Sequence, residues 1–348
     1  MNITAAKFLK TVNKDNLLHL VLGLGEEDYY KEELAHKLTA VLFGDLPEEE
    51  RSAAIFDGKA SLPEVQEAIN TYPFFAGQNL VVLRNLQLLE GEAKAASAKT
   101  AKDREQLLQL LQDIPPYAYV LVLCNKLDKR TKLYSALSKS AAVVTCDSIK
   151  YYSLKPWLDE QAASYGARFD YKAIALISEY MSITETVPLS LLKQEIDKLA
   201  IYAGQRKQWT QEDVENIFAD LPAASAFAVG NAVTEGRLVQ FLELVALEKK
   251  KGTNILPLVG GVTTALRRLC LLKELVEAGE RPDALAAKLH MHPYVVKLNV
   301  AASQRFTLAS LRHAMVELTQ LNIKMRLGGR TFERLEEIVV ELIQQNAK

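Results

Sequence analysis

The chain has 348 residues, of which 49% are hydrophobic and 24% are charged. This composition is typical of a folded globular protein and excludes disordered and collagen-like chains. Its 42 basic and 43 acidic residues leave a formal net charge of −1, so no strong overall field would draw it to nucleic acid. At ~100–200 residues per domain, the length suggests two or three domains.

The three cysteines are too few and too scattered for a disulfide framework or a zinc site, and they fit a reducing compartment. No stretch approaches the ~18 consecutive apolar residues of a membrane-spanning helix. The lysines near the amino terminus are not followed by the apolar segment of a signal peptide. We therefore expect a soluble protein of the cytoplasm that makes no membrane contact. The cysteines are Cys124, Cys146 and Cys270.

Residues 1–147 alternate short, apolar, β-branched runs with stretches of helical spacing such as Glu26–Phe43 and Asp103–Gln112. The runs are nearly continuously apolar, as expected for strands buried on both faces of a parallel sheet. Alternation of strands and helices predicts an α/β domain, a parallel sheet with flanking helices. The predicted strands are Leu17–Gly23, Ala53–Asp57, Leu80–Arg84, Tyr119–Cys124 and Ala142–Cys146.

After these strands no further strand is predicted, and the pattern is helical. Residues 148–219 predict a small helical domain, whose last helix opens with Thr210 and an acid at Asp213, a capped start. A Leu-Pro pair at 221–222 follows, and residues 220–348 predict a second all-helical domain with apolar stripes in its core. The predicted helices of the small domain are Lys155–Tyr165, Tyr171–Met181, Leu189–Tyr202 and Thr210–Ala219. The stripes of the second are Leu308, Leu311, Met315, Leu318, Leu321 and Met325, then Leu335, Ile338, Val339, Leu342 and Ile343.

A glycine-containing turn between the first predicted strand and the next helix is the setting of a phosphate-binding loop. When the pattern Gly-x-x-x-x-Gly-Lys-Ser/Thr is counted from Gly23, Asp28 stands in place of the second glycine. Tyr29 then replaces the lysine and Tyr30 the magnesium-binding hydroxyl, while Gly25 remains as a turn glycine. Three carboxylates at the start of the helix would repel a polyphosphate. They are Glu26, Glu27 and Asp28.

The acidic residue that should end a strand and hold Mg²⁺ is also missing. The strand Leu80–Arg84 ends in Arg84 and Asn85, with a cation where a carboxylate is needed. With both parts absent, we predict no nucleotide cofactor, no bound metal and no ATP hydrolysis by this chain.

Other catalytic signatures do not add up to a site. The segment Asn125-Lys126-Leu127-Asp128 matches the guanine-reading Asn-Lys-x-Asp of GTPases, but no Asp-x-x-Gly occurs in the sequence. A polar turn after a buried strand is the better interpretation. His290 and His292 are two residues apart and do not share a helix face, so incidental loop histidines are favoured over metal ligands. No Gly-x-Ser-x-Gly, His-Glu-x-x-His or Cys-x-x-Cys is present. We predict no catalytic residue.

Two adjacent aromatic residues, Phe74 and Phe75, lie between a predicted helix that ends at Asn70 and the strand Leu80–Arg84. Neighbouring side chains in a turn cannot easily both face one core. General burial statistics nevertheless favour burial of both. The alternative is a hydrophobic tip that anchors a partner, where such residues can contribute ~2–4 kcal/mol each.

Several segments in a particular order carry a resemblance to a known family. Together with the incomplete phosphate loop and the two helical regions, they are similar to the delta-subunit family of bacterial DNA polymerase III clamp loaders. The resemblance covers nearly the whole chain. The segments are Val21–Tyr29, Phe56–Gly58, Asn70–Phe75, Asn79–Asn85, Leu127–Tyr134 and Leu191–Leu199.

The resemblance implies an AAA+ fold without ATPase activity over residues 1–147, a lid over 148–219 and an oligomerisation collar over 220–348. It implies a heteropentamer with tau or gamma ATPase subunits and delta prime, within the DNA polymerase III holoenzyme. In this family the delta subunit binds the ring-shaped beta sliding clamp and opens it for loading onto primed DNA.

Phe74 and Phe75 match the pair of apolar residues that the family inserts into a pocket on the clamp. The family pair is often aliphatic and aromatic, whereas both residues are aromatic here. The resemblance therefore reverses the expectation from burial statistics, and we expect both side chains to be exposed.

Two alternatives stay open at this point. One is an active AAA+ or GTP-type NTPase with an unusual loop, which nucleotide binding by the isolated chain would favour. The other is a helical scaffold outside replication, which would not copurify with the clamp or with tau and gamma. No residue is predicted to contact DNA, because the basic clusters are interpreted as solvated surface. These clusters are Lys126, Lys129, Arg130 and Lys132, and the pair Arg267 and Arg268.

Overall fold

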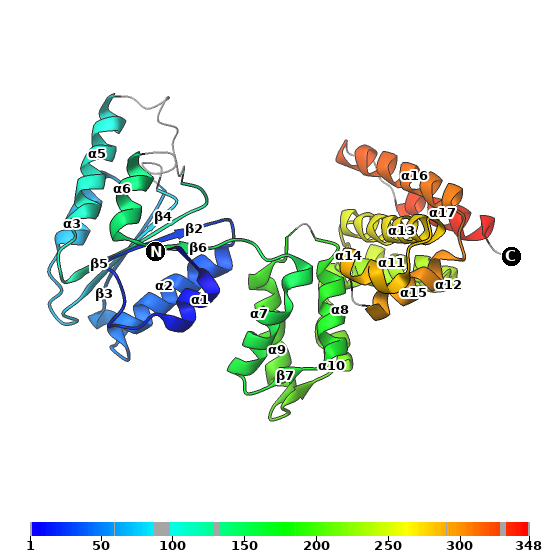
Figure 1. The fold of residues 1–348 in the computed structure, drawn as a ribbon, viewed down its shortest axis with the longest axis horizontal. Coiled ribbons are helices and arrows are strands. Elements are labelled where there is room, and N and C mark those ends of the chain that lie inside the picture. The colour runs from blue at the N-terminus through cyan, green and yellow to red at the C-terminus, as the bar shows by residue number, and fades with distance from the viewer. Residues whose placement is uncertain are drawn as a thin grey trace. The chain divides into compact units, whose positions relative to one another are not determined.

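The fold is that of a computed structural model, drawn in Figure 1. It describes residues 2–58, 60–86, 98–127, 132–184, 186–289, 291, 293–327 and 332–346. The chain divides into two compact units, residues 1–148 and residues 149–348, and each is described by itself. The predicted further division of the helical part between residues 219 and 220 stays a prediction.

The first unit is built on a six-stranded sheet with the order β1-β6-β2-β5-β4-β3, in which every pair of neighbours is parallel. The three central strands β2, β5 and β4 are almost entirely buried, as their continuous apolar sequences predicted. The predicted parallel sheet is confirmed. Its strands are β1 (Asn2–Thr4), β2 (Leu20–Leu24), β3 (Ser52–Asp57), β4 (Asn79–Arg84), β5 (Ala118–Cys124) and β6 (Ala142–Thr145).

Two features of the sheet differ from the prediction. Strand β1 was not expected, because three residues are too few to show a periodic pattern. Strand β3 was expected to be buried on both faces, which is wrong: its residues alternate in exposure, and Ile55 is 62% exposed. The reason is its position, since β3 pairs only with β4 and forms the edge of the sheet.

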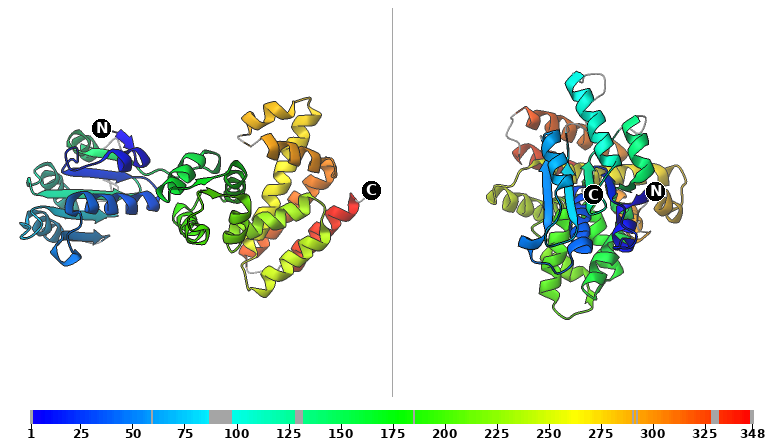
Figure 2. Two further views of the ribbon diagram at one scale, coloured as in Figure 1. Left: turned by 90° about the horizontal axis from the view of Figure 1, so that it is seen from below. Right: turned by 90° about the vertical axis from the view of Figure 1, so that its left-hand side faces the viewer.

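Helices lie on both faces of this sheet (Figures 1 and 2). Helices α1 and α2 pack together on one face, and α3, α5 and α6 pack in sequence on the other. Buried side chains of α3 and α5 meet the central strands in one hydrophobic core. The helices are α1 (Ala5–Thr11), α2 (Asp28–Phe43), a 3₁₀ turn η1 (Glu48–Glu50), α3 (Leu62–Asn70), α5 (Ala98–Gln112) and α6 (Lys132–Ser140).

The second unit is almost entirely helical, which confirms the predicted class. The predicted helix Tyr171–Met181 has those bounds, and the other three of the small region begin and end within one or two residues of the prediction. The elements are η2 (Tyr151–Ser153), α7 (Lys155–Ser164), β7 (Arg168–Phe169), α8 (Tyr171–Met181), α9 (Leu189–Ala203), β8 (Gln208–Trp209), α10 (Gln211–Ile217), α11 (Pro222–Thr234), α12 (Leu238–Lys250), α13 (Leu256–Glu277), α14 (Pro282–Lys288), α15 (Pro293–Ser303), α16 (Leu308–Arg326) and α17 (Phe332–Gln345).

The prediction that no strand follows residue 148 is wrong in a minor way. Strands β7 and β8 have two residues each and pair in parallel, with Phe169 opposite Trp209. Two residues cannot reveal an alternating pattern. The predicted cap of α10 is confirmed, because the Asp213 carboxylate accepts hydrogen bonds from the Thr210 N–H and hydroxyl at 2.8 and 3.1 Å.

Helices α11, α12, α13, α16 and α17 share the main core of the second unit. The predicted apolar stripes of α16 and α17 lie in or against that core. Within the described residues no single helix is long and apolar enough to cross a membrane. Helices α10 and α11 reach that length and apolarity only as a pair, with a bend of 113° between them.

Candidate functional site

The helix that precedes the two phenylalanines is fixed at its start and along one face. The Ser61 N–H and hydroxyl both donate to the Glu64 carboxylate, at 2.8 and 2.7 Å, in a capping box. Leu62, Val65 and Ile69 bury the inner face of α3 against the sheet. Helix α3 therefore carries the following turn on a rigid base.

The turn after α3 exposes both phenylalanines. Phe74 is 93% exposed and Phe75 is 77% exposed, and their ring centroids lie 6.1 Å apart. Pro73 before them is buried, and Gly77 after them has a φ of 64°, a left-handed conformation that glycine adopts without strain. The structure thus places Phe74 and Phe75 in solvent, as the family resemblance implied and contrary to general burial statistics. We call residues 72–77 the aromatic tip.

The phosphate-loop segment folds as a turn from β2 into α2, but its backbone N–H groups already have protein acceptors. The Gly25 N–H donates to the Cys124 carbonyl at 3.2 Å, and the Glu27 N–H donates to the Cys146 carbonyl at 3.0 Å. A side chain at Gly25, whose φ is 148°, would place its Cβ 2.1 Å from the Cys146 carbonyl oxygen. A phosphate loop needs free N–H groups that point at the ligand. In this turn two of them hold the ends of β5 and β6 instead.

The start of α2 is occupied by a side chain of its own. The Glu27 carboxylate accepts a hydrogen bond from the Tyr29 N–H at 3.2 Å, where an anion would otherwise bind the helix terminus. Burial raises the pKa of Glu27 above its ordinary value, and the hydrogen bond from Tyr29 opposes that rise in part. Tyr29 and Tyr30 are themselves buried in the core. The loss of a phosphate site at these residues stays a prediction, and Glu27 is the side chain that would compete with a bound anion.

A second frame of the phosphate-loop pattern contains the lysine, although Tyr30 stands in place of its second glycine. Counted from Gly25, the lysine position is Lys31 rather than Tyr29, and the hydroxyl position is Glu32. Lys31 is only 5% exposed, and its Nζ donates to the Asn125 side-chain carbonyl and pairs with Asp28 at 2.8 Å. A lysine is therefore present at this edge of the sheet, but it is held by protein oxygens.

An ion pair connects the two positions that would hold magnesium. Arg84, where a strand-ending acid is needed, binds both carboxylate oxygens of Glu32 at 2.9 Å. This is the bidentate geometry that arginine and carboxylate favour. Because a guanidinium fills the space beside Glu32, the pair opposes binding of a divalent cation there.

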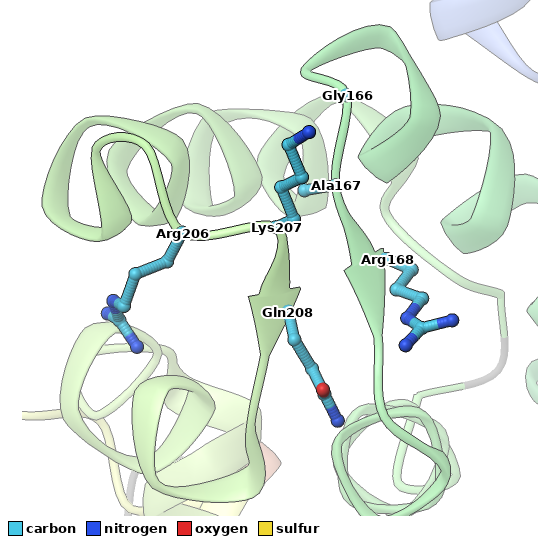
Figure 3. Close-up of a pocket in the computed structure, with 6 residues that line it drawn as sticks. All are labelled: Gly166, Ala167, Arg168, Arg206, Lys207 and Gln208. Carbon is cyan, nitrogen blue, oxygen red and sulfur yellow. The ribbon is translucent and has the colours of Figure 1, made fainter.

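Neither of two cavities in the structure has the size and lining expected of a nucleotide site. One of about 160 Å³ lies at the carboxyl ends of β2, β5 and β6, and it is smaller than the ~300–1,000 Å³ of typical ligand pockets. Another of about 610 Å³ opens between the turns that precede β7 and β8 in the second unit. In Figure 3 its basic side chains, Arg168, Arg206 and Lys207, point away from one another rather than towards a common centre. Arg206 is moreover bound by Asp213 at 2.8 and 3.0 Å.

The remaining predicted positions carry no chemistry that the structure reveals. Burial raises the pKa of Cys146 to about 12, so this thiol stays protonated at neutral pH and is a poor nucleophile. Within the described ranges no group of three or more His, Cys, Asp or Glu side chains could hold a metal ion. Arg268 is tied to Glu179 and Ser182 inside the second unit, whereas Arg267 is exposed. Other predicted positions lie outside the described residues; they are Asp128, Lys129, Arg130, His290 and His292.

Comparisons with known proteins agree on one family. Residues 21–147 match the family model of the DNA polymerase III delta subunit, and residues 223–342 match the model of its C-terminal domain. The DNA polymerase III subunit delta of Bacillus subtilis strain 168 is 23% identical over 343 residues, which cover 97% of each chain. The solved structure of the Bacillus subtilis DNA clamp loader delta protein has the same fold, with a TM-score of 0.59 and 22% identity over 98% of each chain. The chain therefore belongs to the delta-subunit family of DNA polymerase III.

Proposed function

We propose that this chain binds the beta sliding clamp through Phe74 and Phe75 and helps to open the ring for loading onto primed DNA. The observation that carries the proposal is the exposure of two adjacent phenylalanines on a turn held between α3 and β4. Burying one such side chain is worth ~1.5–3 kcal/mol. In the free chain Phe74 and Phe75 are mostly exposed, so most of this burial free energy is not realised. Insertion of both side chains into a pocket on a partner would provide it.

Clamp opening is a shift of a conformational equilibrium. A ligand shifts that equilibrium only by the difference between its affinities for the two states. The chain must therefore bind the open or strained clamp more tightly than the closed clamp. The aromatic tip supplies affinity, and the surface of α3 beside it is the region that can distinguish the two states.

The chain does not hydrolyse ATP in this proposal. Support comes from the start of α2, where Glu27 takes the position of an anion, and from the Glu32–Arg84 ion pair. ATP would act through the tau or gamma subunits, which we propose as neighbours together with delta prime in a cytoplasmic heteropentamer. Residues 220–348 would form the collar of that assembly and residues 148–219 the lid.

Binding of the purified chain to its beta clamp tests the proposal. The double variant Phe74→Ala, Phe75→Ala should lose roughly a thousandfold in affinity, because two anchor residues of ~2 kcal/mol or more each are removed. Its unfolding temperature should not fall, since neither side chain packs in the core. Ile55→Ala is the matched control, because Ile55 is an apolar residue 62% exposed in the same unit. It should bind as the wild type does.

Three results would contradict the proposal in whole or in part. Absence of binding by the folded wild-type chain would remove clamp recognition altogether. Unchanged binding by the double variant would keep the partner but exclude the aromatic tip as the anchor. Tight binding of ATP or GTP by the isolated chain would favour the alternative of an active NTPase.

A further inference from the structure

The last turn of α3 ends without a glycine. The final four carbonyl groups of a helix lack partners within the helix and must find them elsewhere. The Glu67 carbonyl accepts from the Thr71 N–H at 2.9 Å and from the Thr71 hydroxyl at 2.7 Å. Thr71 is already in an extended conformation, with φ −68° and ψ 120°. The next carbonyl groups receive their hydrogen bonds from two side chains, one at the start of β4 and one directly before β5.

The first of these side chains is Asn79, which begins β4 and is 2% exposed. Its Nδ2 donates to the Ala68 carbonyl at 2.6 Å and is 3.4 Å from the Thr71 carbonyl. Its Oδ1 accepts from the Ser52 hydroxyl at 3.2 Å. One buried amide thus joins the end of α3, before the aromatic tip, to the starts of β3 and β4. Asn79 itself follows the tip in the sequence.

The second side chain is Tyr117, which directly precedes β5. Its hydroxyl donates to the Asn70 carbonyl at 2.9 Å, and its backbone carbonyl accepts from the Asn79 N–H at 2.8 Å. Its ring packs edge-on against Tyr72, with centroids 5.1 Å apart. Tyr117 therefore contacts the chain immediately before and immediately after the aromatic tip.

We infer that Asn79 and Tyr117 are positioning residues for clamp recognition, because they hold both ends of the aromatic tip and so keep Phe74 and Phe75 in their protruding arrangement. This inference rests on the proposed function. Neither residue needs to touch the clamp. Asn79 is buried, and the Tyr117 hydroxyl is engaged by the helix end.

The physical reason is preorganisation. A turn that exposes two phenylalanines would otherwise move and fold its rings onto nearby apolar surface, because that burial is favourable. Only the fraction of molecules with the binding-competent arrangement can associate, so the apparent affinity scales with that fraction. Loss of a positioning residue should therefore slow association, whereas loss of a contact residue should speed dissociation.

The variant Tyr117→Phe separates these roles, because it removes one hydroxyl and keeps the ring that packs on Tyr72. With immobilised beta clamp, we expect the association rate to fall, by at most about fivefold, the effect of an ordinary net hydrogen bond on a local equilibrium. The dissociation rate should stay that of the wild type. Tyr134→Phe is the control, since it removes a hydroxyl from α6 at the other edge of the sheet, and it should leave both rates unchanged.

Amide hydrogen exchange gives a second readout on the free chain. In Tyr117→Phe, exchange of residues 71–78 should accelerate several-fold while the central strands β2 and β5 keep their protection. Wild-type rates in binding together with unchanged exchange would overturn the inference. A faster dissociation at an unchanged association rate would overturn it too, because the hydroxyl would then be a direct contact. In both cases tight binding by the wild type would leave the proposed function standing, and only its absence would remove that function as well.

Discussion

In the first unit, the carboxyl ends and the amino ends of the parallel strands differ in what they leave exposed. We call them the carboxyl edge and the amino edge of the sheet. At the carboxyl edge, where parallel α/β sheets usually bind ligands, the Gly25 and Glu27 N–H groups, the Lys31 ammonium and the two terminal nitrogens of Arg84 have partners within the protein. At the amino edge, Asn79 and Tyr117 donate hydrogen bonds to the end of α3, but two phenylalanines are left in water.

The difference supports the proposal that the amino edge, and not the carboxyl edge, meets a partner. A buried polar group without a partner is costly, so the internal hydrogen bonds at the carboxyl edge stabilise it and occupy groups that a ligand would need. The amino edge uses its hydrogen bonds to support an apolar surface that gains free energy only when something covers it. In the proposed function, the same scaffold thus combines a closed carboxyl edge with an amino edge that binds a protein.

The largest expected effect tests how tightly the carboxyl edge is closed. Gly25→Ala should lower the free energy of unfolding by about 3 kcal/mol or more, because its Cβ would lie 2.1 Å from the Cys146 carbonyl oxygen at a φ of 148°. Gly58→Ala is the control, with a φ of 67° and no atom within 4 Å of the added Cβ, and should cost ~1 kcal/mol. Urea unfolding measures both. A mild effect at Gly25 would mean that the loop is looser than described.

The ion pair that replaces the magnesium site should have a smaller effect. A double-mutant cycle with Glu32→Gln and Arg84→Gln should give a coupling of ~1 kcal/mol or less, because Glu32 is 48% and Arg84 is 25% exposed. None of the three variants should gain ATP binding, since Glu27 still caps α2. Nucleotide binding by Arg84→Gln, seen by calorimetry, would show that this cation alone had closed the edge.

At the amino edge, Tyr72 should add a modest share to recognition. Tyr72 is 66% exposed, and one face of its ring is used by Tyr117. Tyr72→Ala should weaken clamp binding roughly two- to fivefold, as expected for an aromatic contact at the rim of an interface. A loss as large as that of the phenylalanine double variant would make Tyr72 part of the anchor.

The smallest effect concerns pH. Burial raises the pKa of Glu27 in the folded state, so the folded chain holds this proton more tightly than the unfolded chain does. The resulting stability is complete below the unfolded pKa of about 4.5 and is lost as pH rises through the higher folded pKa. Glu27→Gln should therefore gain stability relative to the wild type between pH 4 and pH 7, measured as the difference in unfolding free energy. A relative loss over that range would reverse the assigned direction.

Most of the fold could be predicted because the central strands are buried on both faces and therefore continuously apolar. Strands β1, β7 and β8 could not, because two or three residues carry no period, and Ile55 is exposed only because β3 has a single neighbour. Lys31 and Glu32 were missed because the loop pattern was counted from Gly23; counting from Gly25 would have found them.

The candidate site likewise contains features that local sequence patterns do not predict. Exposure of Phe74 and Phe75 followed from the family resemblance and not from residue statistics. Asn79 and Tyr117 were missed entirely. Their importance depends on hydrogen bonds to the end of α3 from residues up to 47 positions away, and no local pattern records such contacts.

The affinity of the isolated chain for its beta clamp, measured with and without Mg-ATP, tests the central claim most directly. We predict the same affinity in both conditions for the wild type, and loss of binding in both for the Phe74→Ala, Phe75→Ala variant. An affinity of the isolated wild-type chain that changes with Mg-ATP would show that the carboxyl edge is an open ligand site. Binding that survives in the double variant would show that the amino edge is not where the clamp is recognised.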